Sequence, residues 1–279
     1  MKRNKRNATE GARVFKKWAV ALYETETLGS FLKDVLHPGG LELTRRAGMI
    51  AQVDEECTVL DIACGKGEGI LFLGEEFGCQ IVGIDLSLRK IADAAAGATQ
   101  RNLAKSFSFL VSDAEDMPFA DATFDVVLSE CSFSVLPSKE KAASEIARVL
   151  KPGGRFVMTD IVLEMDKIGR IPSRSIADTD LMLPCIAGAQ STARYIEIFE
   201  MSGLCDPYVE DHSKELKKIG YQIAMTFGGW KEFLQALSLE LCYSSFKKEE
   251  LAGLCSVKPF TKRSAGQSLG YVLIRVTKP

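Results

Sequence analysis

The chain has 279 residues, of which 46% are hydrophobic and 26% charged, and its formal net charge is −2 at pH 7. This balance is ordinary for a globular enzyme and does not favour nucleic acid as a partner, since the one basic cluster lies at the extreme N-terminus (Lys2, Arg3, Lys5 and Arg6), where a solvated chain end explains it. No stretch approaches the ~18 apolar residues of a membrane span, and the charged start lacks the apolar region of a secretory signal, so we expect a cytoplasmic protein with no membrane partner.

Short apolar runs bounded by polar or turn residues predict the buried strands of a parallel sheet. In the first part of the chain such strands are expected at 58–62, 80–84, 107–111, 124–129 and 155–160. Segments of helical composition lie between or beside them and predict helices at 41–52, 68–77, 87–103, 138–150 and 191–202. Strand and helix therefore alternate, which favours right-handed βαβ units in a doubly wound α/β sheet.

The second part of the chain is less regular. Residues 161–190 lack clear periodicity and are interpreted as a lid or substrate loop, whereas 207–211 and 269–276 read as two further strands. The amphipathic stretch between those strands predicts a helical insertion. Its apolar face could contact a second copy of the chain, so a monomer and a homodimer are both compatible with the sequence. We therefore expect an N-terminal cap segment (1–40), a core (41–212 and 266–279) and a helical insertion (213–265).

The strongest motif is a strand that runs directly into a glycine loop and then a helix, Asp61-Ile62-Ala63-Cys64-Gly65-Lys66-Gly67-Glu68-Gly69. Glycine lets the backbone approach a ligand closely and adopt positive φ. Asp85 ends the second strand, 20 residues after Gly65, where a carboxylate can accept both ribose hydroxyls of a cofactor. The pattern indicates a nucleoside-type cofactor at the carboxyl ends of the strands.

Asp85 does not distinguish NAD from S-adenosylmethionine (SAM), because both classes of enzyme place an acid there. Dinucleotide sites normally keep apolar residues ahead of the first glycine, since an anion there would repel the pyrophosphate. Asp61 occupies this position here. A carboxylate suits the cationic ammonium and sulfonium groups of SAM, so Asp61 disfavours an NAD-dependent oxidoreductase.

A third motif, Asp113-Ala114, follows the third strand, where the aspartate could accept a hydrogen bond from an adenine amino group. Next come Phe124-Asp125-Val126-Val127-Leu128-Ser129-Glu130-Cys131 and Arg148-Val149-Leu150-Lys151-Pro152-Gly153-Gly154. With these motifs in this order, residues 55–160 resemble the class I SAM-dependent methyltransferases (methyltransferase type 11). The resemblance is greatest to the branch that includes the ubiquinone/menaquinone-biosynthesis C-methyltransferases.

The resemblance implies a Rossmann-like fold with a seven-stranded sheet in the order 3-2-1-4-5-7-6, the seventh strand antiparallel. It also implies SAM as cofactor, S-adenosylhomocysteine (SAH) as product, and a small-molecule acceptor. The family usually has Gly or Ala at position 64, and Cys64 is small enough to fit. The cofactor-binding residues implied are Asp61, Ala63, Cys64, Gly65, Gly67, Gly69, Asp85, Leu86, Asp113, Ala114 and Glu130.

Residues 184–189, Pro-Cys-Ile-Ala-Gly-Ala, also resemble the segment of arsenite methyltransferases that supplies one arsenic-binding cysteine, here Cys185. Soft thiolates suit As(III). That family needs further thiols, one of them ahead of the glycine loop, and this chain has no cysteine before Cys57. Cys131, just past the fourth strand, faces the usual acceptor side, and Cys205 is another candidate. The alternative is that Cys185 is a small buried residue of the lid.

Residues before the core are expected to contribute as well, because the N-terminal segment commonly covers the cofactor in this family. Tyr23, Cys131 and Cys185 are the predicted acceptor-binding residues. Methyl transfer from a sulfonium is an in-line displacement that depends mainly on positioning, and Glu130 or His37 would be the base if the acceptor must be deprotonated. No metal-binding spacing is present. The predicted function is methyl transfer to a small molecule; the alternatives are arsenite methylation through Cys185 and a SAM-binding protein without transferase activity.

Overall fold

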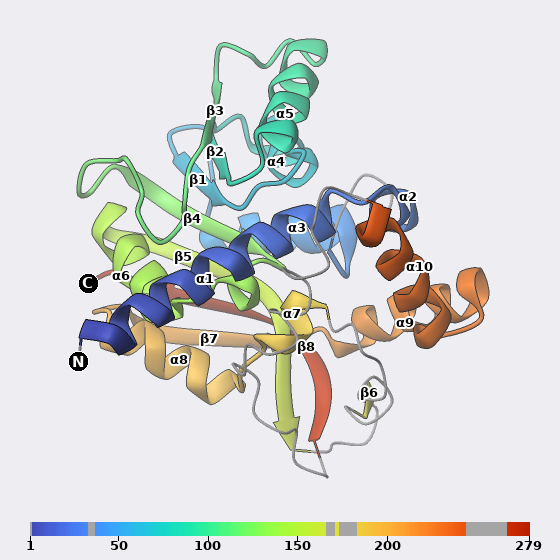
Figure 1. The fold of residues 1–279 in the computed structure, drawn as a ribbon. Coiled ribbons are helices and arrows are strands. Elements are labelled where there is room, and N and C mark those ends of the chain that lie inside the picture. Colours follow the sequence, from blue (N-terminus) through green and yellow to red (C-terminus); the bar gives the residue numbers. More distant parts are fainter. Residues whose placement is uncertain (1, 33–36, 166–170, 173–182, 244–266) are drawn as a thin grey trace.

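The computed structural model describes residues 2–32, 37–165, 171–172, 183–243 and 267–279, and Figure 1 shows their arrangement. The strands are β1 (Thr58–Ile62), β2 (Gln80–Asp85), β3 (Phe107–Val111), β4 (Phe124–Glu130), β5 (Leu150–Met165), β6 (Ile171–Pro172), β7 (Cys205–Asp211) and β8 (Gln267–Thr277). The helices are α1 (Lys2–Tyr23), α2 (Glu26–Leu32), α3 (Gly40–Ala51), α4 (Glu68–Phe77), α5 (Leu88–Gln100), the 3-10 helix η1 (Phe133–Val135), α6 (Lys139–Val149), α7 (Pro184–Ala187), α8 (Thr192–Met201), α9 (Ser213–Phe227) and α10 (Trp230–Tyr243).

The strands form one sheet in the order β3-β2-β1-β4-β5-β8-β6, and β7 also pairs with β8. Strands β1 to β5 pair with one another in parallel, whereas β8 is antiparallel to β5, β6 and β7. With β7 as the sixth and β8 as the seventh of the expected strands, the predicted order 3-2-1-4-5-7-6 and its antiparallel seventh strand are confirmed. The two-residue β6 is an addition that the sequence did not predict.

Helices cover both faces of the sheet, as its alternating side chains require. Leu60 and Ile62 pack with α6 and α8 in one apolar cluster. Val59 faces the opposite side and packs with α3 and α4 in a second cluster. Because neighbouring side chains of a strand point to opposite faces, Asp61 lies on the same face as Val59, toward α3 and α4.

The segment after β4 and β5 differs in part from the expectation. Strand β5 extends to Met165, beyond the predicted 155–160, because it pairs with β8 without interruption from Arg155 opposite Thr277 to Met165 opposite Gln267. Residues 161–165 are therefore strand and not loop. The rest of the expected lid that the structure describes contains the short strand β6, the short helix α7 and a bridge between Val162 and Gln190. Residues 166–170 and 173–182 lie outside the described residues.

The N-terminal helices and the helices between β7 and β8 share a third apolar cluster. Phe15, Trp18, Leu22 and Leu28 of α1 and α2 pack against Ile223, Phe233, Leu234, Leu237 and Leu241 of α9 and α10. In Figure 1, α1 crosses in front of the sheet, and α9 and α10 lie beyond the C-terminal end of α1. Residues 244–265 of the expected insertion lie outside the described residues, and the division into cap, core and insertion stays a prediction.

Of the helices in the described ranges, none combines the length and the apolar character needed to cross a membrane. The cytoplasmic location and the oligomeric state stay predictions.

Candidate functional site

The carboxyl ends of the parallel strands bring the predicted cofactor residues to one edge of the sheet. Strand β1 pairs with β4 so that Asp61 lies opposite Leu128, and Glu130 is two residues further along the same face of β4. Strand β2 ends beside them at Asp85. Alternation along adjacent strands thus places the Asp61 and Glu130 carboxyl groups on the same side of the sheet, next to the start of α4.

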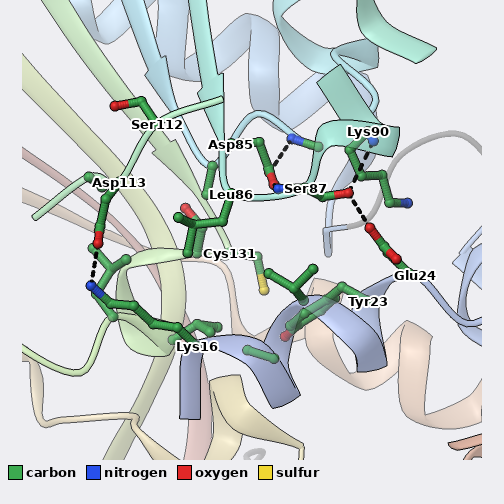
Figure 2. Close-up of a pocket in the computed structure, with 18 of the residues that line it drawn as sticks. Lys16, Tyr23, Glu24, Asp85, Leu86, Ser87, Lys90, Ser112, Asp113 and Cys131 are labelled. Atoms are coloured by element: carbon green, nitrogen blue, oxygen red, sulfur yellow. Dashed lines mark hydrogen bonds and ion pairs between the residues drawn. The ribbon is translucent and has the colours of Figure 1, made fainter. Parts of the chain in front are cut away.

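A cavity that opens to solvent lies at this edge of the sheet, with about 900 Å³ of empty space that includes its mouth. Figure 2 shows Asp85, Leu86 and Ser112 on the sheet side and Lys16 and Tyr23 of α1 on the opposite side. Of the predicted residues, those lining it are Tyr23, Ala63, Gly65, Asp85, Leu86, Asp113, Ala114, Glu130 and Cys131. Those not lining it are His37, Asp61, Cys64, Gly67, Gly69 and Cys185.

The Asp85 carboxylate is held by backbone amides on both sides. Its Oδ2 accepts a hydrogen bond from Gly65 N at 3.0 Å, and its Oδ1 accepts one from Ser87 N at 2.8 Å. Burial raises the pKa of Asp85, and these two amide donors oppose that rise. The carboxylate therefore has a fixed orientation between the glycine loop and α5.

The backbone is left-handed at two non-glycine residues of the cavity wall. Ala63, after β1, has φ 57°, and Cys131, after β4, has φ 52°. Non-glycine residues rarely adopt this region, and such conformations concentrate at functional sites. The loop after β1 also contains Gly67 at φ 79°, where an added Cβ would lie 3.0 Å from the Cβ of Ala94. The loop is therefore shaped by its glycines, although only part of it faces the cavity.

Asp61 is a buried carboxylate with no counterion in the described part of the chain. Its residue is 6% exposed, and no hydrogen bond or ion pair joins its side chain to another described residue. Burial raises the pKa of Asp61 well above its usual range, and the charges of Glu130 and Asp85 add to the rise. A buried carboxylate is unfavourable unless a cation is bound beside it. The site is therefore electrostatically complementary to a ligand with a positive charge, which fits the ammonium group of SAM.

Both predicted base candidates belong to one buried cluster. Thr44 Oγ1 donates a hydrogen bond to Glu130 Oε1 at 2.9 Å. His37 Nε2 lies 3.2 Å from Thr44 Oγ1 and 3.5 Å from Glu130 Oε1. The sequence predicted Glu130 and His37 separately, and the fold brings them together through α3.

The predicted adenine residue Asp113 already has two partners within the chain. Its Oδ2 lies 2.7 Å from the ammonium of Lys16, and its Oδ1 accepts a hydrogen bond from Glu115 N at 3.0 Å. Lys16 is also 2.7 Å from the Glu115 carboxylate. Burial alone would lower the pKa of Lys16, but the hydrogen bonds to the two carboxylates outweigh it and raise the pKa. An adenine amino group would therefore share Asp113 with Lys16.

The three predicted acceptor residues lie together. The Cys185 side chain interacts with those of Cys131 and Tyr23, and in Figure 2 the Cys131 sulfur points toward the side where Tyr23 lies. A hydrogen bond from Cys131 lowers the pKa of Cys185 although burial opposes it, whereas the same contact together with burial raises the pKa of Cys131 well above its usual range. Burial also raises the pKa of Tyr23 well above its usual range. The two thiols and the Tyr23 hydroxyl therefore form one interacting group.

Several lining residues were not predicted from the sequence. Lys16, Ser87 and Lys90 line the cavity, as do Val135, Leu136 and Pro137 after β4. Ser87 could have been found, because a serine directly after the strand-end acid is a preferred helix N-cap, and its Oγ accepts a hydrogen bond from Lys90 N at 3.1 Å. Lys16 has no comparable local signal. In the described part of the chain, no cluster of three His, Cys, Asp or Glu side chains could hold a metal ion.

Comparisons with known proteins agree with this geometry. The model of a family described as "Methyltransferase domain" matches residues 53–220, more than half of the chain. Tocopherol O-methyltransferase of Arabidopsis thaliana is 38% identical over 119 residues, which cover 42% of this chain and 34% of that protein. Arsenite methyltransferase of Halobacterium salinarum is 29% identical over 136 residues, which cover 48% of this chain and 34% of that protein.

Among solved structures, the [4+2]-cyclase SpnF superimposes with a TM-score of 0.66 at 23% identity over 93% of both chains, a likeness of fold alone. The first curated relatives are matched over about a third to a little more than half of their own length: 53%, 34% and 57%. The family match and the strand order nonetheless agree with the motifs from Asp61 to Gly154. The chain therefore belongs to the methyltransferase domain family, with the fold of the class I SAM-dependent methyltransferases.

Proposed function

We propose that this protein transfers a methyl group from SAM to a small-molecule acceptor. The observation that supports the proposal most strongly is the buried carboxylate of Asp61, which has no cationic partner among the described residues and lies beside Glu130 and Asp85. Bound SAM would supply a methyl group on a positively charged sulfonium. The surplus of negative charge at this edge favours that cofactor over NAD, whose pyrophosphate it would repel.

The proposed cofactor contacts combine residues of the cavity wall with Asp61, Cys64, Gly67 and Gly69, which do not line the cavity themselves. Asp61 and Glu130 would bind the ammonium group of the methionine part, with the loop through Ala63, Cys64, Gly65, Gly67 and Gly69 around it. Asp85 would accept the ribose hydroxyls in the orientation that the amides of Gly65 and Ser87 fix. Leu86 and Ala114 would pack on the adenine, and Asp113 would accept from its amino group.

The acceptor would bind on the side of the cavity formed by α1 and the segment after β4. This side combines the apolar residues Val135, Leu136 and Pro137 with Tyr23 and Cys131. We propose an acceptor with an apolar body, a class to which the acceptor named for the tocopherol O-methyltransferase relative also belongs. The protein would act mainly by positioning the acceptor atom in line with the transferred methyl group.

Calorimetric titration of the purified chain tests the cofactor assignment. We expect SAM and SAH to bind with micromolar-range dissociation constants and NAD to give no heat; Asp85→Ala should abolish most of the binding. Saturable NAD binding without SAM binding would overturn the proposal.

Labelled SAM incubated with quinols, phenols, amines, thiols and arsenite then tests transfer. SAM binding without any labelled product would favour the alternative of a SAM-binding protein that does not catalyse transfer.

Arsenite methylation is a second candidate, favoured by the contact of Cys185 with Cys131. Two adjacent thiols beside the cofactor cavity suit a soft metalloid, and one relative is an arsenite methyltransferase. Cys185→Ser should then abolish As(III) binding and leave SAM binding unchanged, whereas Cys205→Ser, at an exposed cysteine, should change neither. As(III) affinity that is the same in wild type and Cys185→Ser would exclude this candidate.

A further inference from the structure

The hydrogen bonds around Glu130 link it to His37 through Thr44. Thr44 Oγ1 lies 2.9 Å from Glu130 Oε1, to which it can donate its one hydroxyl proton, and 3.2 Å from His37 Nε2. The other ring nitrogen, His37 Nδ1, lies 3.2 Å from the carbonyl oxygen of Pro38, which can only accept. His37 and Thr44 are 7% and 0% exposed, and neither lines the cavity. An imidazole that is buried and has a hydrogen-bond partner at each nitrogen is poorly placed to remove a proton from an acceptor.

The second oxygen of Glu130 is left available by contrast. No described residue donates a hydrogen bond to Glu130 Oε2, and Glu130 lines the cavity. Gly69, in the first turn of α4, leaves room for this oxygen, since an added Cβ there would lie 2.6 Å from it. One oxygen is therefore fixed by α3 and by His37, while the other lies beside a glycine on the same side of the sheet as Asp61.

We propose that His37 and Thr44 are positioning residues that hold Glu130 so that its Oε2, together with Asp61, binds the ammonium group of SAM and of SAH. The inference rests on the proposed function, and it replaces the predicted role of His37 as a base. A carboxylate that is fixed before the ligand arrives loses less conformational freedom on binding. His37 and Thr44 lie just before and within α3, so they connect the N-terminal part of the chain to the methionine end of the site.

The test is calorimetric titration of SAM and SAH with matched variants, together with steady-state kinetics once an acceptor is known. His37→Ala and Thr44→Val should each raise the Kd of both ligands about tenfold, the effect expected for one lost buried hydrogen bond to a charged group. KM for SAM should rise with little change in kcat, because the lost interaction is made equally in the ground state and the transition state. His37→Gln, whose amide can both donate and accept a hydrogen bond, should restore the Kd to within about threefold of wild type.

The second histidine of the chain provides the control. His212 Nε2 lies 3.0 Å from Glu210 at the end of β7, a pair of the same kind that does not line the cavity. His212→Ala should leave both Kd values unchanged. Thermal unfolding of every variant shows which ones fold. If His37→Ala does not fold, the Kd values of Thr44→Val test the inference.

Three results would overturn the inference. Unchanged Kd values with a large loss of kcat in His37→Ala would make His37 a base. Unchanged Kd values and kcat would show that the cluster is not used. Equal loss in His37→Ala and His37→Gln would show that the hydrogen bond between residue 37 and Thr44 is not what matters. Failure of the wild-type chain to bind SAM and SAH would instead refute the proposed function itself.

Discussion

The ammonium of Lys16 on α1 lies 2.7 Å from the carboxylate of Asp113 after β3, a contact between residues 97 positions apart in the chain. At the other end of the same helical segment, Glu24 accepts a hydrogen bond from Ser87 Oγ, as Figure 2 shows. The C-terminal part of α1 is thus fastened on both sides of the cavity. These contacts therefore hold α1 over the cavity, and we expect them to slow the release of a ligand bound beneath it.

Removing the first contact should speed ligand release. Lys16→Met keeps most of the side-chain volume but loses both ion pairs, so we expect SAH to dissociate about fivefold faster, in line with the modest strength of partly buried ion pairs. Stopped-flow displacement of SAH measures this rate. Lys17→Met, at the exposed neighbouring lysine, is the control and should not change it. Equal rates in the two variants would show that α1 does not retain the ligand.

The affinity for SAM should fall as the pH is lowered. Because the pKa of Asp61 is raised, this carboxyl takes up a proton at a higher pH than an ordinary aspartate, and the neutral form no longer attracts an ammonium group. Asp61→Asn should weaken SAM binding at neutral pH by about tenfold to a hundredfold and should show a flatter pH dependence. Titrations from pH 5 to 8 compare the two; parallel pH curves would contradict the assignment.

Gly69→Ala should weaken SAM binding because its Cβ would lie 2.6 Å from Glu130 Oε2 and displace the carboxylate. Ala is otherwise the better helix residue, so any loss of affinity cannot come from helix propensity. Gly29→Ala in α2, where an added Cβ meets nothing within 4 Å, is the matched control. We expect a Kd increase of about tenfold in the first variant and none in the second. Calorimetry that finds equal Kd values would remove Glu130 from the site.

Asp160 should make the stability of the fold depend on pH. It is buried in β5 and accepts hydrogen bonds from Ser134 N and Oγ, both at 2.7 Å. Burial raises its pKa from the ordinary 3.8 to about 6, against the opposing effect of those hydrogen bonds. Between these two pH values the folded state holds a proton that the unfolded state has lost, so the contribution of Asp160 to the free energy of unfolding falls as pH rises from about 4 to about 6.

The expected fall is up to about 3 kcal/mol, and it levels off above pH 6. Urea denaturation gives the free energy of unfolding of wild type and of Asp160→Asn across this pH range. The difference between the two free energies should change with pH by this amount. A difference that stays constant with pH would show that Asp160 has an ordinary pKa.

The sequence predicted the elements whose signals are local. The strand at 58–62, the helix at 68–77 and the start of the helix at 191–202 depend on residues close together in the chain. At that last start, Ser191 Oγ accepts a hydrogen bond from Arg194 N. The extension of β5 to Met165 was not predicted, since it depends on pairing with β8, about a hundred residues further along the chain.

The site shows the same division. The acids at 61, 85 and 113 were predicted because each ends or follows a strand. The Lys16 contact, the Thr44 hydroxyl on Glu130 and the apolar wall at 135–137 were not, because they arise only when distant segments pack together. Cys185 and Tyr23 were singled out by resemblance, but their contact comes from the fold.

The central claim is that Asp61 and Glu130 form a site for the ammonium group of SAM. Its most direct test is a double-mutant cycle by calorimetry. The two ligands are SAH and an SAH analogue in which hydrogen replaces the α-amino group, and each is titrated into wild type and into Asp61→Asn. We predict that the analogue binds wild type at least about tenfold more weakly than SAH, and that this penalty largely disappears in Asp61→Asn. The same penalty in both proteins would contradict the account.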